Sequence, residues 1–122
     1  MKHRIASLIA GLVLFAALAL AQTHSVTLTF PAGTGGGAVT SFQIQRSTVS
    51  GGPYTTIGTV PFVTGQTTYT YIDTFNLVEG TTYFYVEEAI GPGGTSAASP
   101  ESSATIPFSG PAIPGKATIV VK

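Results

Sequence analysis

The sequence contains no cysteine and no tryptophan, and only 8% of its 122 residues are charged. Without cysteine there can be no disulfide, thiolate zinc site, iron–sulfur cluster or cysteine nucleophile. The formal net charge is zero and no basic stripe is present, so we expect no nucleic-acid partner. The length allows one small domain.

One long apolar run is present, at the N-terminus. Residues 5–18 carry no charge, follow two basic residues and lead into the small-x-small pattern Ala-Leu-Ala that signal peptidase accepts. We therefore predict that residues 1–21 are a signal peptide of bacterial style, cleaved between Ala21 and Gln22. The protein would then meet the membrane only during export, and would be secreted or held in the cell envelope or periplasm. An uncleaved anchor helix is the alternative, because the run is near the shortest that spans a bilayer.

After residue 21 the apolar residues alternate with period two and never follow a helical period. Strands are predicted at residues 26–30, 42–46, 54–60, 69–73, 81–90 and 103–108. Short strands separated by glycine and proline at regular spacing are typical of an antiparallel sandwich or a small barrel. We expect one all-β domain over residues 22–108, preceded by the signal-peptide helix.

Two glycine clusters, GTGGGAV at 33–39 and SGGPY at 50–54, raise the question of a phosphate-binding loop. Such a loop needs a lysine and a hydroxyl residue after its glycines, at the start of a helix. Both clusters lack the lysine and lead into predicted strands. Gly51 and Gly52 supply the positive backbone angles of a hairpin turn. We interpret both clusters as turns, and we expect no cofactor.

The segments VTSFQIQRSTVSGGPYTTI and LVEGTTYFYV resemble strands C and C′ and the E–F corner of the fibronectin type III family, in its bacterial secreted form. The resemblance covers residues 24–108 and implies an immunoglobulin-like antiparallel β-sandwich. It places Leu77, Thr81 and Tyr83 in the tyrosine corner, where the Tyr83 hydroxyl should bond to the backbone near Leu77. Glu79 occupies the usual proline position of this corner, which should loosen it slightly.

A possible ion pair follows from the strand periods. Glu87 is in phase with Tyr83 and Tyr85, on the face that should be buried, and an unpaired buried carboxylate is costly or shifts its pKa upward. Arg46 is in phase with the apolar residues of the adjacent strand. We therefore hypothesise an Arg46–Glu87 ion pair. The alternative is a bulge that turns Glu87 outward.

The resemblance also leaves one strand unaccounted for. The first predicted strand corresponds to strand B, so strand A is missing, and an unpaired edge recruits strands. Residues 109–122 begin as a proline- and glycine-rich linker and continue into ATIVV at 117–121, which is similar to a strand A. Three arrangements remain open, of which we prefer the first. This tail pairs with its own domain, it fills the edge of a neighbouring copy by strand addition, or it is a disordered remnant of a longer multidomain arrangement.

Candidate catalytic residues are few. His24 is close to the predicted new N-terminus, where an exposed surface histidine is expected rather than a general base. Asp73 should cap the turn after its strand. Glu87 and Glu88 point to opposite faces of one strand and cannot act as a carboxylate pair. The sequence has no G-x-S-x-G elbow and no calcium loop, so we expect neither catalysis nor a bound metal.

Three aromatic residues, Tyr54, Tyr71 and Phe84, are candidates for an outward-facing strip that stacks on sugars or meets a protein. The alternative is that they only cover the sheet and pack with threonines. The resemblance implies a non-catalytic binding or structural module for protein–protein or surface adhesion, with another protein or an extracellular polysaccharide as partner. A carbohydrate-binding accessory module and a bacteriophage virion decoration component are the alternatives, and an export signal argues against the second.

Overall fold

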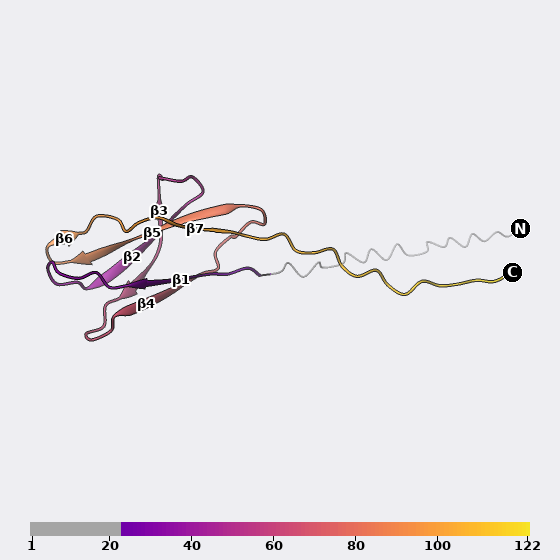
Figure 1. Ribbon diagram of the computed structural model, residues 1–122, viewed down its shortest axis with the longest axis horizontal. Coiled ribbons are helices and arrows are strands. Elements are labelled where there is room, and N and C mark those ends of the chain that lie inside the picture. The colour runs from indigo at the N-terminus through magenta and orange to yellow at the C-terminus, as the bar shows by residue number, and fades with distance from the viewer. Residues whose placement is uncertain (1–22) are drawn as a thin grey trace, which may run out of the picture.

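A computed structural model describes residues 23–122 and shows two antiparallel β-sheets packed face to face (Figure 1). The strands are β1 (Val26–Pro31), β2 (Ser41–Ser47), β3 (Thr55–Pro61), β4 (Thr68–Asp73), β5 (Thr82–Gly91), β6 (Gly94–Thr95) and β7 (Ser102–Thr105). No helix within residues 23–122 is long and apolar enough to cross a membrane. The predicted signal peptide and its cleavage site between Ala21 and Gln22 lie outside the described residues.

The smaller sheet pairs β1 with β4, and the larger sheet has the order β3-β2-β5, with β6 and β7 both paired to β5. All six strands predicted from period-two alternation are present. The last is shorter than predicted, since β7 ends at Thr105. Ile106 still donates its N–H to the Thr81 carbonyl, but Pro107 has no N–H with which to extend the ladder.

The core lies between the two sheets, where alternate side chains of each strand meet. Its buried residues are Leu28, Phe30, Phe42, Ile44, Tyr69, Tyr83, Tyr85 and Ile106. Aromatic rings dominate the packing. The rings of Phe42 and Tyr69 are 4.6 Å apart and those of Phe30 and Phe42 are 5.3 Å apart, so the two sheets are joined mainly through ring contacts.

The C-terminal tail, residues 109–122, contains no strand and is exposed throughout. It runs away from the sheets at the end of the domain where β1 begins (Figure 1). The preferred arrangement, in which residues 117–121 pair with their own domain, is therefore wrong. The physical reason is the direction of exit, because the tail leaves at the β1 start and would have to reverse to reach the edge of β1.

Candidate functional site

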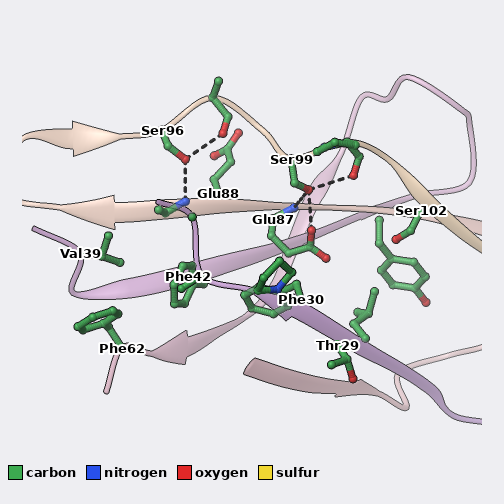
Figure 2. A pocket seen from close by; sticks show the side chains of 18 of the residues that line it. Thr29, Phe30, Val39, Phe42, Phe62, Glu87, Glu88, Ser96, Ser99 and Ser102 are labelled. Atoms are coloured by element: carbon green, nitrogen blue, oxygen red, sulfur yellow. Dashed lines mark hydrogen bonds between the residues drawn. The ribbon is translucent and has the colours of Figure 1, made fainter. Parts of the chain in front are cut away.

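The main concave feature is a groove along β1, with a volume of about 870 Å³. We call it the β1 groove; β1 forms one wall, and β5 with residues 96–104 forms the other. Figure 2 shows Phe30 and Phe42 inside it and Glu87 with Ser99 along its rim. Apolar side chains from both sheets reach its floor, because one side of the sandwich is left uncovered there.

The groove exists because β1 is an edge strand. β1 pairs with β4 on one side, and no other strand within residues 23–122 pairs with it. Ala32 donates its N–H to the Thr67 carbonyl at 2.9 Å. Because backbone groups alternate in an antiparallel ladder, those of Thr27 and Thr29 then point to the open edge. An edge with free N–H and C=O groups is a template for a further strand.

The hypothesised Arg46–Glu87 ion pair is wrong. In the β2–β5 ladder Glu87 lies opposite Ile44, while Arg46 lies opposite Tyr85. The Glu87 carboxylate instead accepts a 2.6 Å hydrogen bond from the Ser99 hydroxyl, at the rim of the β1 groove. The alternative also fails, since the β2–β5 register is regular through Glu87 and no bulge turns this residue outward.

Arg46 pairs with Asp73, which lies on β4 in the facing sheet. The Arg46 Nη1 donates to Asp73 Oδ2 at 2.9 Å and to the Phe75 carbonyl at 2.8 Å. Asp73 is only 1% exposed. It also accepts from the Tyr85 hydroxyl at 2.7 Å and from the Phe75 N–H at 3.1 Å. The predicted turn cap by Asp73 is therefore present, but the sequence did not reveal its two side-chain partners.

This buried network has an electrostatic consequence. Burial, together with the hydrogen bond to Asp73, raises the pKa of the Tyr85 phenol. The guanidinium of Arg46 also lies 4.8 Å from the centre of the Tyr83 ring, a cation–π distance. The network joins the two sheets, and one of its members, Tyr85, also lines the β1 groove.

The tyrosine corner has the predicted geometry. The Tyr83 hydroxyl accepts from the Val78 N–H at 2.9 Å and donates to the Asn76 carbonyl at 3.2 Å. These two residues flank Leu77, where the resemblance placed the contact. Thr81 closes the corner turn with its N–H on the Val78 carbonyl at 3.2 Å.

Glu79, at the usual proline position of the corner, uses its carboxylate to contact two residues far away in the sequence. Its carboxylate accepts from the Ser109 hydroxyl and is 3.2 Å from His24 Nε2. The hydrogen bond from Ser109, then that from His24, lowers the pKa of Glu79. The expectation of an exposed His24 is wrong, because its side chain is only 13% exposed. Glu79 thus clasps both ends of the domain, at residues 24 and 109.

The turn at Gly51 and Gly52 has positive φ at both residues, 86° and 90°, as predicted. It also holds a carboxylate of its own chain. The Gly51 N–H and the Ser50 hydroxyl each donate to Glu101 at 2.7 Å, and the Tyr54 hydroxyl donates to it as well. These bonds, that from Tyr54 first, lower the pKa of Glu101, and the same contact raises the pKa of Tyr54.

Tyr54, Tyr71 and Phe84 are all half-buried and lie on separate elements. Tyr71 packs against the core and donates its hydroxyl to the Ile57 carbonyl at 2.9 Å. The expected outward orientation is wrong for Tyr71, since it is in phase with the inward residues of β4. Tyr54 is engaged by Glu101. The three residues therefore form no continuous strip.

Other candidate sites are sparse. No group of three histidine, aspartate or glutamate side chains in residues 23–122 is arranged to hold a metal ion. The aromatic side chains with the highest exposure are Phe75 at 65% and Phe108 at 77%, and neither was singled out from the sequence. The β1 groove is thus the feature with the clearest capacity to bind another molecule.

Comparisons with solved structures show what the chain resembles, whereas comparisons of its sequence found no match. No family model matches the sequence, and no curated protein matches it. Among solved structures, the chain is similar to a Fn3-like protein from Clostridium thermocellum, with 36% sequence identity and a TM-score of 0.53. The similarity covers 74% of this chain and 84% of that protein.

Proposed function

Since this chain belongs to the Fn3-like family, we propose that it is a non-catalytic module of the cell exterior or envelope that binds another protein through the β1 groove. The Fn3-like fold suggests a module for binding or structure. Because one fold serves many functions, the specific function has to be argued from the site.

The observation that carries the proposal is the open edge of β1 beside an apolar groove. An extended polypeptide satisfies both features at once. Its backbone pairs with Thr27 and Thr29, and its alternate side chains enter the groove, as in recognition by strand addition. A polysaccharide would need a flat, exposed aromatic platform. The carbohydrate alternative has less support, because Tyr54 and Tyr71 are held by contacts with their own chain.

The proposed location depends on the N-terminal segment. We infer that export removes residues 1–21 and leaves Gln22 as the first residue. The intact mass of the protein recovered outside the cytoplasm tests this directly. A mass that includes residues 1–21 would contradict cleavage and support the anchor alternative.

The proposed binding site is tested by photo-crosslinking in the cells that produce the protein. A photo-reactive residue replaces Thr29, exposed on β1, and in a matched variant it replaces Thr59, exposed on β3. We expect protein adducts at position 29 and few at position 59. Equal labelling at both positions, or no protein adduct at position 29, would contradict the proposal.

A further inference from the structure

We propose that the β1 groove is filled by residues 117–121 of a second copy of this chain, so that copies join head to tail. This inference rests on the proposed function, because it names the occupant of the same groove. It is one of the arrangements that the sequence left open for the tail. Three independent features of the molecule support it.

The first feature is the tail itself. Ile119 is 83% exposed and Val121 is 89% exposed, although β-branched residues favour strands with at least one covered face. As a strand, residues 117–121 place Ala117, Ile119 and Val121 on one face, because side chains alternate. That face is entirely apolar and matches the apolar floor of the β1 groove. Val120 would point away from the groove.

The second feature is chain direction. An antiparallel partner for β1 must run from the Pro31 end toward the Val26 end. The tail leaves its own domain at the Val26 end, where Ser109 and His24 both contact Glu79. Entering its own groove from there, it would run parallel to β1, which is the slightly less stable pairing. The tail of a second copy can enter from the Pro31 end and run antiparallel.

The third feature is charge. Residues 23–108 carry five carboxylates and a single arginine, whereas the tail carries Lys116 and Lys122 and no acidic side chain. One of those carboxylates, Glu87, lies at the rim of the groove, whereas Glu88 points to the opposite face of β5 and bonds to Gln45 there. The lysines bracket the apolar segment, so a seated tail brings opposite charges together. Charge complementarity of this kind steers association and fixes register.

The donor side is tested with two lysine substitutions. Ile119→Lys places a charge on the face that enters the groove, and the matched control Val120→Lys places it on the outward face. Neither residue packs on the domain, so the unfolding midpoint should not change. All variants are expressed from residue 1 and purified identically, and sedimentation velocity measures their mass across concentrations. We expect Ile119→Lys to weaken association at least about tenfold and Val120→Lys to have little effect.

The acceptor side is tested with Thr29→Pro, which removes an edge-facing N–H and leaves the ladder to β4 intact, since proline is tolerated on edge strands. Thr27→Pro is the second acceptor variant if the first proves unstable. We expect Thr29→Pro and Ile119→Lys each to be monomeric alone. Mixed together, they should form a 1:1 dimer, because one still donates a tail and the other still accepts it.

Two outcomes would overturn the inference. One is a wild-type chain that stays monomeric at concentrations near 1 mM, roughly the weakest specific affinity that matters. The other is a mixture of the two variants that forms no dimer while wild type associates. Adducts of a different protein at position 29 of a monomeric chain would exclude self-assembly and leave the proposed function standing. If position 29 forms no protein adduct at all, both the self-assembly and the proposed function are contradicted.

Discussion

At the scale of single residues, Asp73 joins the two sheets. It lies on β4 and receives hydrogen bonds from Arg46 on β2 and Tyr85 on β5. A carboxylate that is 1% exposed is tolerable only when it is paired and fully hydrogen-bonded. Loss of one partner leaves the other charge buried, so we infer that this network fixes how the sheets align.

A pair of double-mutant cycles tests whether Arg46 pairs with Asp73 or with Glu87. We expect Arg46→Met and Asp73→Asn to couple by about 1–3 kcal/mol in the free energy of unfolding, because each removes the other's partner. Arg46→Met and Glu87→Gln should be additive to within about 0.5 kcal/mol. Urea unfolding of the six proteins measures both cycles. Coupling to Glu87 and not to Asp73 would contradict the geometry described above.

The hydrogen bonds that the Glu101 carboxylate accepts make the free energy of unfolding depend on pH. The pKa of Glu101 is lowered in the folded protein, whereas an unfolded glutamate titrates near about 4.3. Between the two pKa values the unfolded chain binds more protons, so stability is present above about pH 4.3 and is lost as the pH falls through the folded pKa. Unfolding midpoints of Glu101→Gln, measured from pH 7 to pH 3, should fall less than those of wild type.

One further variant extends that test. Tyr54→Phe removes the largest cause of the lowered pKa of Glu101, so it should reduce the acid dependence in part. Glu79 has a lowered pKa of the same sign, so Glu101→Gln should keep some acid dependence. A pH profile of Glu101→Gln that superimposes on wild type would show that the hydrogen bonds to Glu101 add nothing to stability.

The partner of Arg46 illustrates what the sequence could not provide. Period-two alternation assigns a residue to a face, and it placed both Arg46 and Glu87 inward. It carries no information on which strand of the facing sheet lies across from that face. The corner contact of Tyr83 was predicted from the family resemblance, whose motif spans both partners, five and seven residues away. No motif links Arg46 to Asp73, which is 27 residues away.

At the scale of elements, the strands were the most predictable part of the molecule. Alternation bounded by glycine and proline located all six predicted strands, and the missing neighbour of β1 was anticipated from the resemblance. The β1 groove itself was not predicted. Its rim forms where Ser99 of the β6–β7 connection binds Glu87, and such irregular segments follow tertiary contacts instead of a repeating pattern.

One close approach between elements gives a clear prediction. At the end of β5, a Cβ added to Gly91 would overlap the backbone carbonyl of Ala38, which cannot rotate aside. We expect Gly91→Ala to destabilise the domain by about 1–3 kcal/mol through overpacking. Gly93 is the matched control, because a Cβ there meets nothing within 4 Å. Thermal unfolding of both variants checks this, and equal midpoints would rule out the close packing of Gly91 on Ala38.

At the scale of the whole molecule, the donor and acceptor lie at opposite ends. The tail departs beside the start of β1 (Figure 1), and an antiparallel donor must enter at the Pro31 end. The two contacting surfaces are therefore different, which makes the interface heterologous. Interfaces of this kind generate open chains unless the rotation between copies closes a ring. The proposed assembly should consequently lengthen with concentration instead of stopping at a dimer.

Salt should tune that assembly without abolishing it. The acidic domain and the two tail lysines attract through water, and the Debye length falls from about 10 Å at 0.1 M salt to about 3 Å at 1 M. Apolar burial of Ile119 and Val121 is not screened in this way.

We expect sodium chloride to weaken association of wild type and to have little effect on the double variant Lys116→Gln/Lys122→Gln. Sedimentation of both proteins over this salt range should show affinities that differ at low salt and converge at high salt. Parallel salt dependences would mean that these lysines do not face the acidic domain in the assembly.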